Sequence, residues 1–133
     1  MNFPGGNLLI NDLAKNIFFK FQADNSQTMG RTVIVLYRPK QGKEKQLLQV
    51  IKDHLPILRA ENLATEKKPV VMRAADGTVV EVFEWKSVEA IRQAHSNQVV
   101  GKLWEQFAEV CDFEIPVNIK EFQNLFSEFE TIE

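Results

Sequence analysis

The sequence predicts an α+β fold in which one antiparallel four-stranded sheet carries helices on one of its faces. Four short runs rich in β-branched and aromatic residues are separated by segments whose apolar residues recur at helical spacing. Between the second and third runs stands Asp76-Gly77, a dipeptide suited to a tight hairpin. These two strands are therefore expected to pair antiparallel.

The first strand is expected at 32–37, TVIVLY, with Pro39 stopping it. A helix follows from Lys43, with its apolar residues on one side and charged residues on the other. Its apolar positions are Leu47, Leu48, Ile51, Leu55 and Leu58. Pro56 cannot donate a hydrogen bond to the carbonyl of Lys52, so this helix should kink or restart there.

The hairpin strands are expected at 69–73 and 78–85. Ser87 can cap a second helix, and Ser96 or Asn97 can cap another. The apolar residues of these helices are Val88, Ile91 and Ala94, then Val100, Leu103, Trp104 and Phe107.

A short fourth strand at 113–115 completes the order strand, helix, strand, strand, helix, strand. This is the order of the ferredoxin-like βαββαβ arrangement. The module spans 31–117. It is flanked by 1–30, expected to be a helical extension with a linker, and by 118–133, expected to be a C-terminal helix.

Both flanking segments carry apolar stripes. The N-terminal stripe consists of Leu9, Leu13, Ile17 and Phe21. Met29, just before the first strand, could be an alternative translation start. Asn118 and Glu121 match a capping box at the start of the C-terminal segment. The side of the expected helix would then carry Phe122, Leu125, Phe126 and Phe129.

The expected sheet is apolar on both faces. Its first strand is apolar at every position from 33 to 37, and its third strand has apolar residues on either side. The face without helices would meet water, so a second layer is needed to cover it. The simplest such layer is the same sheet of a second, symmetry-related copy of the chain. We therefore expect a homodimer.

Composition excludes several classes of protein. A net charge of −2 gives no broad cationic field for nucleic acid or an anionic membrane. No apolar run is long enough to cross a bilayer, and the first residues lack the pattern of a secretory signal. Cys111 is the single cysteine, and the two histidines lack metal-ligand spacing, so neither a disulfide nor a metal site is expected. A reducing cytoplasm fits best.

Three stretches carry a resemblance to a known family: TVIVLYRPKQGKEKQLLQVIKDHL, VVMRAADGTVVEVFEWKS and EAIRQAHSNQVVGKLWEQF. Residues 32–116, which contain them, resemble an antibiotic-biosynthesis-monooxygenase-like domain of the dimeric α+β barrel superfamily. The resemblance implies homodimers that pair their sheets. Known members include cofactor-free oxygenases of aromatic polyketides, heme-degrading enzymes, isomerases and proteins of no known activity, so the fold leaves the function open.

Heme-degrading members place an asparagine, a tryptophan and an iron-binding histidine at positions that align here with 36–37, Ala94 and Trp104. None of the three matches. His95 is adjacent to one of them, but one step along a helix turns a side chain by about a quarter turn. No cofactor is therefore expected.

Tyr37 and His95 are the candidates for catalytic proton transfer. Tyr37 ends the first strand and could hold or deprotonate a phenol, whereas His95 follows the second helix and could exchange a proton near neutral pH. Alternatively, His95 caps the last carbonyls of that helix or faces water.

Trp85, Trp104 and Phe107 are candidates for a substrate pocket between sheet and helices, where an aromatic molecule could stack, or equally for plain core. His54 could join this pocket or make a structural hydrogen bond. Arg73 could steady an anionic intermediate or pair with a nearby glutamate, Glu81 or Glu84.

Two functions stay open from the sequence. The first is a cofactor-independent monooxygenase acting on a small aromatic or quinol-like molecule. The second is a non-enzymatic module that binds a small ligand or serves as a dimeric interaction domain.

Overall fold

A computed structural model describes residues 29–133. In these residues the chain forms an antiparallel sheet of five strands in the order β4-β1-β3-β2-β5. In chain order the elements are β1 (Arg31–Pro39), α2 (Glu44–Ala60), β2 (Val70–Arg73), β3 (Val79–Trp85), α3 (Val88–Ala94), α4 (Gln98–Val110), β4 (Cys111–Glu114), the short 3-10 helices η1 (Pro116–Asn118) and η2 (Lys120–Gln123), and β5 (Glu130–Thr131).

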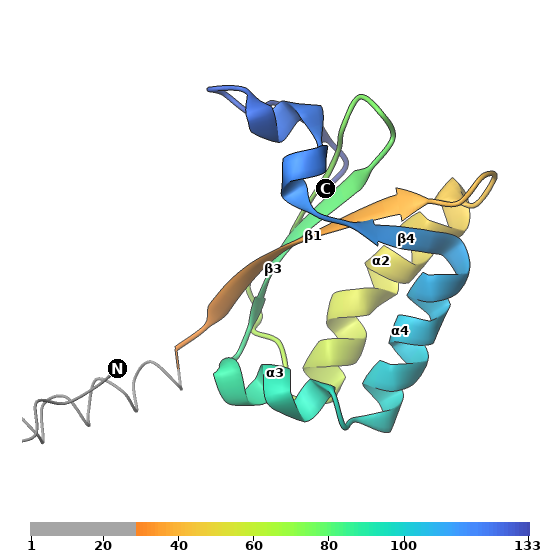
Figure 1. The fold of residues 1–133 in the computed structure, drawn as a ribbon. Coiled ribbons are helices and arrows are strands. Elements are labelled where there is room, and N and C mark those ends of the chain that lie inside the picture. Colours follow the sequence, from red (N-terminus) through yellow and green to blue (C-terminus); the bar gives the residue numbers. More distant parts are fainter. Residues whose placement is uncertain (1–28) are drawn as a thin grey trace, which may run out of the picture.

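The three α-helices lie on one side of the sheet, and the segment after β4 lies on the other (Figure 1). The predicted α+β fold, with helices on one face of an antiparallel sheet, is confirmed, whereas the fifth strand was not predicted. The helix predicted around residues 9–21 lies outside the described residues.

Local signals in the sequence account for the ends of several elements. The side chain of Ser87 accepts a hydrogen bond from the backbone N–H of Ala90 at the start of α3. The side chain of Asn97 accepts one from the N–H of Val100 at the start of α4. Gly77 adopts φ +93°, a left-handed conformation that glycine takes readily, in the turn between β2 and β3.

Helix α2 runs through Pro56 to Ala60, so the predicted restart is not observed. Its buried side consists of Leu47, Ile51, His54, Leu55 and Leu58. The helix therefore presents a single polar ring, that of His54, among aliphatic side chains that face the sheet.

The predicted C-terminal helix at 118–133 is wrong. Two 3-10 turns and an extended stretch take its place. The carboxylate of Glu121 accepts a hydrogen bond from the N–H of Ala75 in the β2–β3 turn, and the amide of Asn118 donates to Glu114. Both side chains of the expected capping box are thus used in contacts that tie the segment to the sheet.

The C-terminal segment crosses the sheet from the β4 edge to the β2 edge, where β5 pairs with β2 (Figure 1). On the way Ile119, Phe122 and Phe129 pack on the face opposite the helices. They cover a row of side chains that runs across three paired strands, namely Leu36, Val80 and Met72. The chain itself thus supplies part of the second layer that the sequence required.

The next row on this outer face is not covered in the same way. Ile34 and Val70 both stand opposite Val82 in the sheet register. Ile34 is 50% exposed and Val70 49% exposed. An apolar strip across β1, β3 and β2 therefore remains at the surface.

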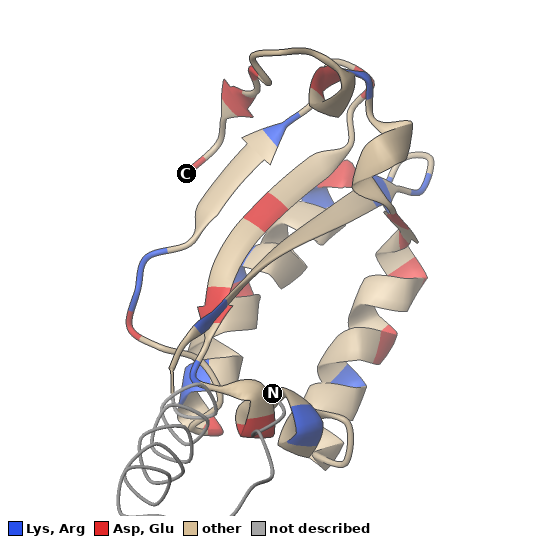
Figure 2. Cartoon of the chain, turned by 60° about the vertical axis from the view of Figure 1, so that its left-hand side comes forward, with Lys and Arg blue, Asp and Glu red and all other residues tan. Residues whose placement is uncertain are grey.

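Charged residues of both signs are distributed over the helices (Figure 2). Helix α4, for example, carries Lys102 beside Glu105 and Glu109. None of the helices in residues 29–133 combines the length and the apolar character that a bilayer span needs.

Candidate functional site

A cavity of about 390 Å³ lies between the sheet and the helix layer. Its lining comes from β1, α2, β3, α4 and β4, and consists of Val33, Val35, Tyr37, His54, Phe83, Trp85, Trp104, Phe107 and Phe113. All of these side chains are aliphatic or aromatic, and their polar atoms are limited to the phenol of Tyr37, the imidazole of His54 and the indole N–H groups of the two tryptophans. The cavity is therefore an aromatic chamber with very few polar groups.

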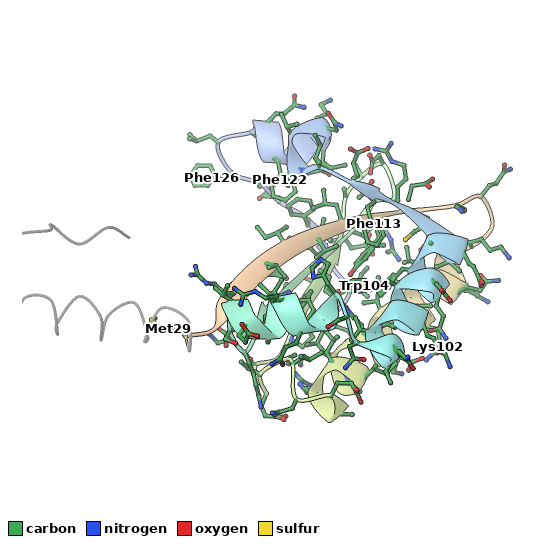
Figure 3. All side chains as sticks on the ribbon, turned by 60° about the horizontal axis from the view of Figure 1, so that its bottom comes forward. Met29, Lys102, Trp104, Phe113, Phe122 and Phe126 are labelled. Carbon is green, nitrogen blue, oxygen red and sulfur yellow. The ribbon has the colours of Figure 1, made fainter. Side chains whose placement is uncertain are left out.

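The cavity has a buried end and an open end. Tyr37, His54 and Phe107 are each 3% exposed or less. Trp104 is half-buried and Phe113 is 57% exposed, and both lie toward the helices, away from Phe122 and Phe126 of the C-terminal segment (Figure 3). A ligand entering past Trp104 and Phe113 would meet Tyr37 and His54 at the inner end.

Glu81 organises the polar groups at this inner end. The hydroxyl of Tyr37 donates a hydrogen bond to Oε1 of Glu81 at 2.7 Å, and Nδ1 of His54 lies 2.8 Å from the same oxygen. Glu81 is fully buried. One side chain from β1 and one from α2 thus contact the same carboxylate oxygen of a residue in β3.

Strand register brings these groups together. Glu81 pairs with Val35 across β1 and β3, and Tyr37, two residues along β1, shares the helix-facing side. The side chain of His54 extends from the buried side of α2 to Glu81 in the sheet. Its ring makes T-shaped contacts with Phe83 and Phe107 at centroid distances of 5.0 and 5.1 Å, which fixes the plane of the imidazole.

Tyr37 is held as a neutral phenol. Burial, the charge of Glu81 and the hydrogen bond to Glu81 together raise the pKa of Tyr37 well above its ordinary value. Its ring stacks on Phe107 with centroids 4.7 Å apart and an angle of 6° between the rings. A proton-accepting role for Tyr37, as the sequence suggested, is therefore disfavoured, and Tyr37 instead serves as a donor to Glu81.

One ring nitrogen of His54, a lining residue of the cavity, makes no hydrogen bond among the described residues. With Nδ1 donating to Glu81, the lone pair is on Nε2. Within residues 29–133, no hydrogen bond joins Nε2 to another group. Oε2 of Glu81 is also buried without a hydrogen-bond partner in that part of the chain. Simple packing does not explain a carboxylate in this place, because burying one is costly unless its hydrogen bonds are complete.

The structure does not bring all the predicted site residues to the cavity. Trp85, Trp104 and Phe107 line it together with Tyr37 and His54. His95 is exposed, and its Nδ1 lies 2.9 Å from the carbonyl of Ile91, so it caps α3 as the alternative interpretation stated. Its ring makes a T-shaped contact with Trp104, with ring centroids 5.2 Å apart.

Arg73 also lies outside the lining. Its guanidinium binds Glu44 at the start of α2 at 2.8 Å and Glu130 of β5 at 3.2 Å. Arg73 therefore does not make the predicted pair with Glu81 or Glu84, and Glu84 lies 3.4 Å from Lys67. Arg73 therefore joins the sheet edge to α2 rather than facing a ligand.

Sequence reasoning missed Glu81 as a site residue. The signal was present in VVEVFEW, because period-two alternation puts Glu81 on the same side of β3 as Val79, Phe83 and Trp85. A carboxylate on the apolar side of a strand is unusual unless it is paired. The sequence instead suggested Glu81 only as an ion-pair partner for Arg73.

Cys111 is a buried thiol behind Tyr37. Burial, and after it the charge of Asp112, raise the pKa of Cys111 to about 11. Its Sγ donates to the carbonyl of Phe107 at 3.1 Å. Cys111 is therefore a small buried group rather than a nucleophile.

No group of three or more His, Cys, Asp or Glu side chains in residues 29–133 is arranged to hold a metal ion. Comparisons of the chain with protein-family models, with curated proteins and with solved structures gave no match. The function has to be inferred from the geometry of the cavity.

Proposed function

We propose that the protein binds a small aromatic, hydroxylated molecule in this cavity and acts on it as a cofactor-independent monooxygenase. The observation that carries the proposal is an aromatic chamber whose polar groups, Tyr37 and His54, converge on buried Glu81 at the inner end. This combination suits a flat apolar ring with one hydroxyl directed inward.

Size and polarity both favour such a ligand. A cavity of about 390 Å³ lies within the range of small-molecule sites. Its lining contains no lysine, arginine or aspartate, so it offers no partner for a phosphate or carboxylate group. Trp85, Phe83 and Phe107 supply ring faces and edges for stacking.

In the proposed reaction the substrate itself supplies the electrons. Loss of the hydroxyl proton makes the ring electron-rich, and the ring carbon para to the oxygen transfers electrons to O₂ and forms a C–O bond. One oxygen atom of O₂ stays on this carbon as a carbonyl, and the other leaves as water with two hydrogens from the substrate. For 1-naphthol the products are 1,4-naphthoquinone and water.

The proposal includes the fold family and its assembly. The order β4-β1-β3-β2, with a hairpin between β2 and β3, is that expected of a ferredoxin-like βαββαβ domain. The exposed side chains of Ile34 and Val70, on either side of the partly buried Val82, support a homodimer of the dimeric α+β barrel kind, in which a second copy covers them.

Oxygen consumption with 1-naphthol tests the activity. Val35→Trp should fill the cavity and abolish both naphthoquinone formation and O₂ uptake. Val99→Trp, at an exposed position on α4, is the matched control and should leave both unchanged. The absence of binding and turnover of naphthols by the unmodified protein would overturn the proposal.

Light scattering tests the assembly. A homodimer gives about twice 15.3 kDa, and Ile34→Lys with Val70→Lys should reduce this to the mass of one chain. Val99→Lys serves as the control. Dimer formation without any consumption of naphthol would favour the second candidate, a non-enzymatic interaction module, for which the same apolar strip is the supporting observation.

A further inference from the structure

We propose that His54 and Glu81 form a proton-accepting pair, so that the cavity binds its hydroxylated ligand as the phenolate, with the proton on Nε2 of His54. This inference rests on the proposed function and deepens it, because it defines the ligand as an aromatic ring with an ionisable hydroxyl. His54 is then the catalytic base, and Glu81 is a positioning residue that acts through it.

The first step of the argument is geometric. Nδ1 of His54 lies 2.8 Å from Oε1 of Glu81, which fixes which nitrogen donates and which is left to accept. The imidazole lines the cavity, and the edge contacts with Phe83 and Phe107 hold its plane. A base must lie within hydrogen-bond reach of the proton it takes, and the inner end of this cavity provides such a position at Nε2.

The second step concerns charge. Before transfer the site holds the Glu81 carboxylate, a neutral imidazole and a neutral ligand. After transfer the imidazolium lies between two anions, the carboxylate and the phenolate, and the total charge is unchanged. Coulombic attraction is stronger in an apolar chamber than in water, and the transfer gives the already buried Glu81 carboxylate a cationic partner, which offsets the cost of forming the new charges.

The other titratable groups around His54 do not compete for the proton. Tyr37 from β1 donates to Glu81 and stays neutral, and Cys111, beyond Tyr37 at the start of β4, is a buried thiol that donates to a carbonyl. Helix α4 contributes only the uncharged Trp104 and Phe107 to the lining. On α2 itself, neighbouring Asp53 is exposed and accepts a hydrogen bond from Gln49.

The absorption spectrum of 4-nitrophenol gives a direct test, because its phenolate absorbs in the visible and its neutral form does not. At a pH about one unit below the pKa of the free phenol, the unmodified protein should bind the probe mainly as phenolate, a rise of at least about tenfold in its ionisation constant. His54→Gln should leave the bound probe neutral. Glu81→Gln should remove most of the tenfold rise.

His95→Gln is the matched control, since it removes the other histidine, which does not line the cavity. The spectrum of the bound probe should be the same as with the unmodified protein. An equal loss of phenolate in His95→Gln and His54→Gln would contradict the assignment of the base.

A second probe separates this inference from the proposed function. 4-Nitroanisole has the same ring but no ionisable proton, and quenching of tryptophan fluorescence should show that the unmodified protein and all three variants bind it equally. Failure of the unmodified protein to bind it would overturn the proposed function. Binding of 4-nitroanisole together with a neutral bound 4-nitrophenol would overturn the proton-accepting pair alone, whether or not the variants fold.

Discussion

The imidazole of His54 and the carboxylate of Glu81 form a buried contact of 2.8 Å between α2 and β3. Both side chains are almost wholly removed from solvent. Such a contact joins the helix layer to the sheet, yet it does so with groups that are costly to bury. Its stability cost is consistent with a functional position, since active sites commonly sacrifice stability for polar groups in apolar surroundings.

Replacement of Glu81 by leucine should destabilise the protein strongly. The hydroxyl of Tyr37 and Nδ1 of His54 would both lose their acceptor, and each unpaired buried donor costs about 1–3 kcal/mol. Urea unfolding should therefore show a loss of roughly 2–6 kcal/mol in the free energy of unfolding. The triple variant Tyr37→Phe, His54→Leu, Glu81→Leu should recover most of this loss, because no donor remains unpaired. A single Glu81→Leu variant as stable as the unmodified chain would contradict the described network.

The ionisation of Tyr37 can be followed without interference, because it is the single tyrosine of the chain. Its pKa is raised in the folded state, so the folded protein holds the phenolic proton more tightly than the unfolded chain. The stabilising contribution is complete below the unfolded value of about 10 and is lost as pH rises above it, toward the folded pKa. Tyrosinate absorbance should be absent from the native protein at about pH 11 and appear on unfolding in urea. Full tyrosinate absorbance in the folded protein at that pH would show that Tyr37 is not buried against Glu81.

Much of the fold could be predicted because its signals are local. Ser87 and Asn97 each precede a helix and cap it, and Gly77 supplies the left-handed turn between β2 and β3. These features depend on neighbours within a few residues. The same holds for the alternation along β3, which set out the two faces of the sheet.

The C-terminal segment could not be predicted in this way. Phe122 and Phe129 fit one side of a helix, but tertiary contacts decide their conformation, since they pack with Ile119 over an apolar row of the sheet. Glu121 gives its carboxylate to the N–H of Ala75, far away in sequence. Apolar residues at helical spacing therefore do not reveal the surface on which they pack, and that surface decides their conformation.

The candidate site, too, could be predicted from the sequence only in part. Aromatic residues of the cavity, such as Trp85 and Phe107, were identifiable from composition and spacing. The pairing of Glu81 with His54 depends on how α2 lies across β3, and no sequence spacing specifies that crossing. The sequence points to His95 as a candidate for proton transfer, with helix capping as the alternative, and in the structure His95 caps α3.

The contact between the C-terminal segment and the sheet should contribute substantially to stability. Ile119 is fully buried, and replacing it with alanine removes apolar contacts and leaves a cavity, at a cost of about 2–5 kcal/mol. Glu128→Ala, on the exposed part of the same segment, should change stability by less than about 0.5 kcal/mol. Urea unfolding of the two variants gives the comparison. Equal stability of both would mean that the segment does not pack on the outer face of the sheet.

The turn between β2 and β3 should make stability depend on acid pH. Burial raises the pKa of Asp76, but the hydrogen bond from the backbone N–H of Thr78 and the charge of Arg38 outweigh it, so the net pKa lies below the ordinary value. Because the folded pKa is depressed, the stabilising contribution is present above about pH 3.9, the unfolded value, and is lost as pH falls through the folded pKa. The carboxylate accepts from the N–H of Thr78 at 2.8 Å and lies 3.9 Å from Arg38.

Two substitutions at Asp76 separate the hydrogen bond from the charge. Asp76→Asn keeps an acceptor for Thr78 and should lose little stability at neutral pH, but its stability should fall less steeply than that of the unmodified protein below about pH 4. Asp76→Ala removes the acceptor too and should cost about 1 kcal/mol at neutral pH. Urea unfolding at neutral pH and at about pH 3 gives both quantities. If the stability of Asp76→Asn fell with acid pH as steeply as that of the unmodified chain, the prediction would be contradicted. Such a result would mean that the Asp76 carboxylate binds its proton equally well in the folded and unfolded states.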